Sequence, residues 1–195
     1  MRMIPHLVLA FVAIPVWGAD LQAPGVSNFH QVNDHVYRGA QPTEEGWKSL
    51  AQLGVKTIID LRRQGEHPIE AEGRAAAAAG MRYINVPMQG IAAPSDEQVA
   101  KVLQLLDSSE PVFVHCKLGR DRTGTVIACY RIKHEGWQNQ KALQEAKSYG
   151  LHALEFGMKR YVLTFRSSSD AAAGQMLATA AADQTVATRM ATGKP

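Results

Sequence analysis

A cysteine and an arginine with five residues between them stand in the segment His115-Cys116-Lys117-Leu118-Gly119-Arg120-Asp121-Arg122-Thr123-Gly124. The cysteine follows an apolar stretch typical of a buried strand, and a helix-like pattern begins about six residues later. Backbone N–H groups in such a loop can converge on one centre, and the helix N-terminus adds a partial positive charge. This arrangement binds a tetrahedral oxyanion and stabilises a cysteine thiolate, which is a nucleophile at neutral pH.

The other residue types in this segment suit phosphate. Arg122 offers a planar fork of donors for two oxygens of one phosphate group, which a lysine could not match. Gly119 permits the backbone conformation of a tight anion loop. We therefore predict a phosphate-binding loop made of Lys117, Leu118, Gly119, Arg120, Asp121 and Arg122.

Strand-like and helix-like segments alternate around this loop. Strands are predicted at residues 36–38, 55–61, 82–87 and 111–115, and helices at residues 43–53, 69–79, 95–106, 123–134, 138–149 and 155–165. The alternation predicts an α/β fold with a mainly parallel central sheet flanked by helices. In such sheets ligands bind beyond the carboxyl ends of the strands, which is where the loop after Val114 must lie.

The loop resembles the Cys-x5-Arg-Ser/Thr signature of the protein tyrosine and dual-specificity phosphatases, with His115 before the cysteine and Gly119 within the loop. Tyr37-Arg38-Gly39-Ala40-Gln41-Pro42 and Ile59-Asp60-Leu61-Arg62 resemble early segments of the atypical dual-specificity branch. The resemblance covers residues 28–166 and implies a dual-specificity-phosphatase-like domain there.

By this resemblance, Cys116 attacks phosphorus while Arg122 and the loop amides hold the equatorial oxygens. Thr123 is expected to donate a hydrogen bond to the sulfur. His115 either orders the loop from behind or is an ordinary core histidine.

The resemblance also implies a general acid upstream of the cysteine, and we predict Asp96 for this role. Two alternatives stay open. Asp96 could instead cap the helix that follows it. Asp121 could be the acid within the loop itself, or a brace of that loop.

The expected reaction is hydrolysis of phosphate monoesters through a phospho-cysteine, with no cofactor. Lys117 and Arg120 give the site a basic rim, which is either two solvated charges or a preference for anionic substrates. Phosphorylated proteins and inositol phosphates, including phosphoinositides, are therefore both expected substrates. Alternatives are a rhodanese-like sulfurtransferase, whose loop is typically one residue shorter, and a non-catalytic phosphate-binding module, which usually loses the cysteine or the arginine.

Other residues give weaker signals. No metal site is predicted, because no two histidines share ligand spacing on one helix among His30, His35, His67, His134 and His152. Cys129 lies too far along its helix to reach Cys116, so we expect it to be a small buried hydrophobic residue. The formal net charge is only +3, without a concentrated basic stripe, which argues against a nucleic-acid-binding protein.

The two ends of the chain differ from its middle. Residues 1–19 combine an early positive charge, an apolar run and small residues at Gly18-Ala19, which predicts a signal peptide cut after either residue. The apolar run is shorter than the roughly 20 residues that span a bilayer, although an uncleaved anchor or a buried strand are alternatives. We therefore expect a periplasmic or secreted protein without stable membrane insertion. Residues 167–195 are rich in Ala and Thr and predict a disordered or weakly helical tail. The sequence does not indicate an oligomeric state.

Overall fold

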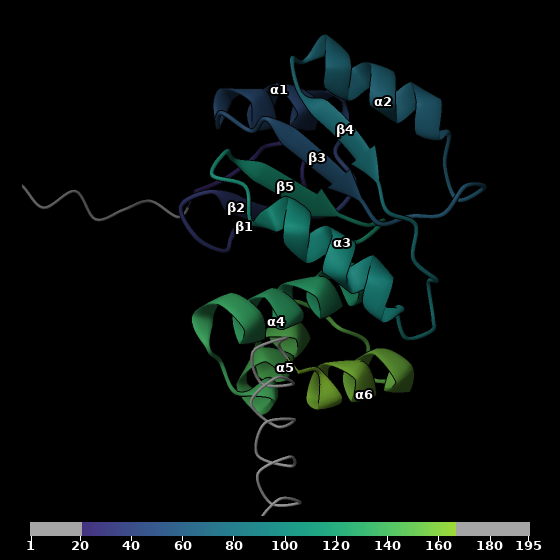
Figure 1. Ribbon diagram of the computed structural model, residues 1–195. Coiled ribbons are helices and arrows are strands. Elements are labelled where there is room, and N and C mark those ends of the chain that lie inside the picture. Colours follow the sequence, from purple (N-terminus) through teal and green to yellow (C-terminus); the bar gives the residue numbers. More distant parts are fainter. Residues whose placement is uncertain (1–20, 167–195) are drawn as a thin grey trace, which may run out of the picture.

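Five strands form one sheet in a computed structural model of the protein, which describes residues 21–166 (Figure 1). The sheet order is β1-β2-β5-β3-β4. The strands are β1 (His30–Gln31), β2 (Val36–Gly39), β3 (Thr57–Asp60), β4 (Arg82–Asn85) and β5 (Val112–His115). Only β1 runs antiparallel to its neighbour, and the pairs β2–β5, β5–β3 and β3–β4 are parallel. The predicted mainly parallel α/β fold is confirmed, whereas the two-residue β1 was not predicted.

Helices cover both faces of the sheet (Figure 1). The helices are α1 (Glu44–Gln52), α2 (Ile69–Ala78), α3 (Asp96–Leu106), α4 (Asp121–Glu135), α5 (Asn139–Ser148) and α6 (Phe156–Thr164). α1 and α2 lie above the sheet in Figure 1 and α3 and α4 below it, while α5 and α6 pack against α4.

Alternation along the strands divides the core into two layers. Ile58 packs in the cluster that contains Trp47 of α1, and its neighbour Ile59 packs with Val99 of α3 and Val126 of α4. Successive side chains of a strand point to opposite faces, so the apolar run at β3 has both faces covered. The sheet is thereby covered by helices on both faces, with the carboxyl ends of its parallel strands at one edge.

The packed fold begins before the predicted limit at Asn28. Ala23 and Val26 are buried in the core with α1, and the Ser49 hydroxyl donates to the carbonyl of Pro24 over 2.8 Å. The predicted signal peptide and the predicted tail lie outside the described residues. Within residues 21–166, none of the helices has the length and hydropathy needed to cross a membrane.

Candidate active site

The Cys116 loop joins the central strand β5 to α4 at the carboxyl edge of the sheet, as predicted. β5 lies between β2 and β3, so the loop has a parallel strand on either side. Cys116 follows the last strand residue directly, and only 3% of its surface is exposed. The fold therefore supplies a shielded thiol at the position where parallel sheets bind ligands.

The loop offers hydrogen-bond donors that the protein itself does not use. Within the described residues, the backbone N–H groups of residues 117–123 donate to no acceptor. The last of these belong to the first turn of α4, whose N–H groups have no partner inside the helix. Together they form the kind of backbone nest that binds anions.

Arg122 lies in the first turn of α4, and Glu66 holds its guanidinium group. Nη1 and Nη2 donate to the two carboxylate oxygens of Glu66 over 2.8 and 2.9 Å. The hydrogen bond from Arg122 lowers the pKa of Glu66 to about 2, so this carboxylate is ionised at neutral pH. Nε of Arg122 has no acceptor in the described chain and is available to a ligand.

Glu66 was missed by the sequence analysis. It comes from the loop between β3 and α2, and 56 positions separate it from Arg122. No spacing or motif marks it, because only the fold brings the two residues together.

Thr123 is completely buried in the first turn of α4, and its hydroxyl has no hydrogen-bond partner among residues 21–166. The hydrogen bond predicted from Thr123 to the sulfur is therefore not formed in this structure. Its role in assisting the departure of the sulfur stays a prediction.

Asp96 is the first residue of α3, but it is not the helix cap. Ser95 caps α3 through a capping box with Gln98. The Asp96 carboxylate accepts a hydrogen bond of 2.8 Å from the Tyr161 hydroxyl. Both residues line a cavity of about 600 Å³ between α3, α4 and α6. These contacts link Asp96 to α6, and no hydrogen bond joins it to Cys116 or Arg122 in the described residues.

Asp121 lies inside the loop segment and begins α4. Its carboxylate accepts a hydrogen bond of 2.7 Å from the backbone N–H of His152, in the connection between α5 and α6. This contact matches the alternative in which Asp121 braces the loop. The side chains of Lys117, Leu118 and Arg120 are exposed around it.

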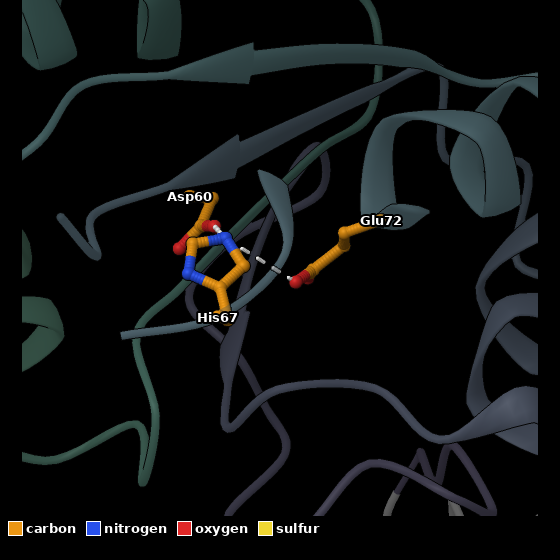
Figure 2. Close-up of side chains that lie close together, drawn as sticks. All are labelled: Asp60, His67 and Glu72. Carbon is orange, nitrogen blue, oxygen red and sulfur yellow. Dashed lines mark ion pairs between the residues drawn. The ribbon is translucent and has the colours of Figure 1, made fainter. Parts of the chain in front are cut away.

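A buried cluster of ionisable residues lies behind the sheet edge that carries the site, and Figure 2 shows three of its members: Asp60, His67 and Glu72. His67 Nε2 is 2.7 Å from Asp60 Oδ2 and 3.6 Å from Glu72 Oε2. The ligand atoms of the three residues lie within 4.8 Å of one another, a grouping the sequence analysis did not foresee. However, the guanidinium of Arg62 also donates to both carboxylates, which places a fixed cation where a metal ion would be needed.

His115 links this cluster to the loop. Its Nε2 is 3.3 Å from Glu72 Oε1, and its Nδ1 is 3.3 Å from the carbonyl oxygen of Cys116. Complete burial lowers the pKa of His115 to about 4, so its ring is neutral at pH 7. Burial also raises the pKa of Glu72 to about 7. His115 therefore supports the loop from behind as part of a core network, which combines the two predicted alternatives.

Cys129 is fully buried on α4 with a free thiol, as predicted. Burial raises the pKa of this thiol, which makes it a poor nucleophile.

Comparisons with known proteins agree with this geometry. The family model described as "DSP-PTPase phosphatase fused to NAD+ Kinase" matches residues 12–162. Dual specificity protein phosphatase TpbA of Pseudomonas aeruginosa (strain UCBPP-PA14) is 33% identical over 140 residues, which are 70% of this chain and 60% of TpbA. Inositol diphosphatase DSP3 of Arabidopsis thaliana is 30% identical over 139 residues, covering 68% of this chain and 66% of that protein.

A solved structure shows the same likeness. The crystal structure of P. aeruginosa TpbA in complex with pTyr has a TM-score of 0.61 and 26% sequence identity, covering 82% of this chain and 98% of that one. In the sequence comparison, by contrast, the chain spans only about 60% of the length of TpbA.

Proposed function

Because this chain belongs to the atypical dual-specificity branch of the protein tyrosine phosphatases, we propose that it hydrolyses phosphate monoesters through a phospho-cysteine at Cys116. One observation carries the proposal: the nearly buried Cys116 begins a loop whose N–H groups at residues 117–123 have no acceptor in the described protein. A phosphoryl group supplies the acceptors that these donors lack.

The first step transfers the phosphoryl group to sulfur. The Cys116 thiolate attacks phosphorus, the new P–S bond forms as the P–O bond to the leaving group breaks, and the leaving oxygen takes a proton from a carboxylic acid. In the second step water attacks phosphorus, gives a proton back to that carboxylate and releases phosphate, so that the thiolate is restored. Arg122 and the loop amides stabilise the charge on the equatorial oxygens in both steps.

Two carboxylates are candidates for the proton donor. Asp96 is supported by family resemblance, but its contact with Tyr161 holds it against α6. Asp121 is supported by its place in the loop, one residue before Arg122, although it also holds the N–H of His152. We retain Asp96 as the proposed acid, with Asp121 as its direct competitor in the variants described below.

Phosphorylated proteins and inositol phosphates are both proposed as substrate classes. The first is supported by the TpbA structure with pTyr and the second by the inositol diphosphatase relative. The exposed cations Lys117 and Arg120 of the Cys116 loop suit either class. We also propose that residues 1–19 direct export to the periplasm or the medium, which mass spectrometry of the mature N-terminus in a periplasmic fraction would test.

The decisive experiment is turnover of para-nitrophenyl phosphate by reduced, full-length protein in the presence of a chelator. We expect activity that Cys116→Ser abolishes and that Cys129→Ala, the matched change at the other cysteine, leaves intact. Chelator-sensitive activity, or activity retained by Cys116→Ser, would refute the phospho-cysteine mechanism. A folded protein without phosphatase activity would next be assayed with thiosulfate for sulfur transfer.

A further inference from the structure

Strand β2 places a buried arginine directly behind the Cys116 loop. Arg38 is 1% exposed and pairs in parallel register with Val114, two residues before Cys116. Its Nη2 donates to the carbonyl oxygen of Gly119 over 2.6 Å, across 81 positions of sequence. The segment 37–42 was recognised in the sequence as a family resemblance, but the proposed chemistry gives Arg38 no task.

Three donors from the N-terminal part of the chain hold successive carbonyl groups of the loop. The N–H of Gln41 donates to Lys117 O over 3.3 Å. The Asn28 amide donates to Gly119 O over 2.9 Å, and it also contacts Tyr149 O at 3.1 Å and Leu118 O at 3.3 Å. Arg38 supplies the second donor to Gly119 O. Every carbonyl from residue 117 to 119 therefore has a donor from the segment 28–41.

This fixation determines where the loop amides point. The described residues contain no cis peptide bond, and in a trans peptide the C=O of one residue and the N–H of the next are antiparallel. Holding the carbonyls of residues 117–119 toward Gln41, Asn28 and Arg38 thus turns the N–H groups of residues 118–120 away from them. These are N–H groups of the anion nest. A cation on the Gly119 carbonyl also polarises that peptide and strengthens the following N–H as a donor.

The guanidinium group of Arg38 makes fewer hydrogen bonds to the protein than a purely structural buried arginine would. Nε and Nη1 of Arg38 are buried without a hydrogen-bond partner in the described residues. The Tyr149 ring lies against the guanidinium group, with its centroid 4.6 Å from the guanidinium carbon, and Glu145 is the main nearby opposite charge. A buried cation with unused donors destabilises a fold relative to an apolar side chain of the same size. Gly119 O would moreover keep the Asn28 amide as a donor if Arg38 were removed.

The loop has no room to move toward β2. Gly119 has φ of +66°, and a Cβ built on it would lie 2.4 Å from the carbonyl carbon of Gly39. The residue that accepts the Arg38 hydrogen bond is therefore packed backbone to backbone against the end of the same strand. Arg38 acts on a loop that is already closely seated.

On the premise of the proposed function, we propose that Arg38 is a positioning residue that orients and polarises the Gly119–Arg120 peptide of the Cys116 loop for oxyanion binding. It acts together with Asn28, and neither residue needs to touch the substrate. Its effect is on the affinity of the loop for a tetrahedral anion rather than on the stability of the fold.

The test measures tungstate binding by isothermal titration calorimetry on the reduced, full-length protein, with circular dichroism to confirm folding. Arg38→Met removes the charge and keeps the length, and we expect tungstate affinity to fall about 10-fold or more. Arg38→Lys keeps the charge and should recover part of the loss. The matched control is Arg82→Met, which removes an arginine of the edge strand β4 that donates to the Thr57 hydroxyl over 3.1 Å. It should leave tungstate affinity unchanged, whatever it does to thermal stability.

A second variant keeps the proposal testable if Arg38→Met does not fold. Asn28 has φ of +51°, so Asn28→Gly deletes its amide without straining the backbone, and it should also weaken tungstate binding. If Arg38→Met folds and binds tungstate with wild-type affinity, the inference is overturned. If Arg38→Met does not fold, wild-type tungstate affinity in Asn28→Gly overturns it. Wild-type protein that binds tungstate but does not turn over phosphate esters would refute the proposed function alone. Failure of the wild type to bind tungstate would refute both.

Discussion

At the scale of single residues, the site depends on an arginine whose orientation another side chain sets. The two hydrogen bonds that Arg122 donates to Glu66 fix the end of its guanidinium group and leave its Nε for the substrate. Charge-assisted bidentate pairs are the strongest hydrogen bonds between side chains.

We expect Glu66→Gln to lower kcat/KM for para-nitrophenyl phosphate by roughly 10- to 100-fold, since one charge-assisted bond is lost and Arg122 gains freedom. Steady-state kinetics would measure the change. Glu70→Gln is the control, because Glu70 is an exposed carboxylate at the start of the neighbouring helix α2. Equal activity of Glu66→Gln and wild type would show that Arg122 is positioned without Glu66.

The proton donor can be assigned by comparing two substitutions. If Asp96 is the acid, Asp96→Asn should slow turnover of alkyl phosphates by roughly 100-fold and of para-nitrophenyl phosphate much less, because nitrophenolate leaves without a proton. Asp121→Asn would then show no such dependence on the leaving group. The opposite pattern would assign the role to Asp121.

Tyr161→Phe is the control for the Asp96 variant, since it removes only the hydrogen bond that holds this carboxylate to α6. A loss of activity in Asp96→Asn that Tyr161→Phe reproduces would indicate an effect on the packing of α3 against α6.

At the scale of elements, the buried cluster joins β3, α2 and β5 and makes their packing depend on pH. Burial raises the pKa of the Glu72 carboxyl from 4.5 to about 7. A raised carboxyl pKa means that the folded state binds the proton more tightly than the unfolded chain. The proton bound by Glu72 therefore stabilises the folded state. This contribution to stability is fully present below about pH 4.5 and is lost as the pH rises through 7.

Glu72→Gln, which is neutral at every pH, should therefore gain thermal stability relative to wild type as the pH rises from 5 to 8. Thermal unfolding followed by circular dichroism at several pH values would give this difference in Tm. Glu70→Gln again serves as the exposed control. A difference in Tm that does not change with pH would contradict a raised pKa at Glu72.

The elements were more predictable than the contacts between them. Apolar runs and caps fixed most helices and strands to within a few residues, as for α1 after its cap Thr43 and α3 after Ser95. The Cys116 loop was predicted because its function depends on local spacing. The sequence analysis missed Glu66, Asn28 and the Asp60–His67–Glu72 cluster. Only tertiary packing creates their contacts, and no pattern in the sequence indicates them.

At the scale of the whole molecule, the N-terminal segment belongs to the folded unit that carries the site. Val26 is buried, and one of its methyl groups lies against Gly39 at the end of β2. The N–H of Thr43, the cap of α1, donates to the carbonyl of Gly25 over 2.9 Å.

A protein that starts at Asn28 should therefore be less stable than one that starts at Asp20. Burial of Val26 alone contributes about 2 kcal/mol. Urea unfolding of the two proteins would measure the loss, and Val26→Ala in the longer protein would show how much of it comes from this side chain. Equal unfolding midpoints would mean that residues 20–27 do not contribute to the fold.

The braces of the Cys116 loop come from far away in the chain, with Asn28 standing 91 positions before Gly119. Such contacts close only after the intervening chain has collapsed around them, which makes them late events in folding. A fragment that carries the loop and α4 without β2 would hold every catalytic residue of the loop and still lack its shape. Recovery of turnover during refolding should consequently lag behind the return of the helical circular dichroism signal. Enzymatic activity would then report when the long-range contacts of the loop form.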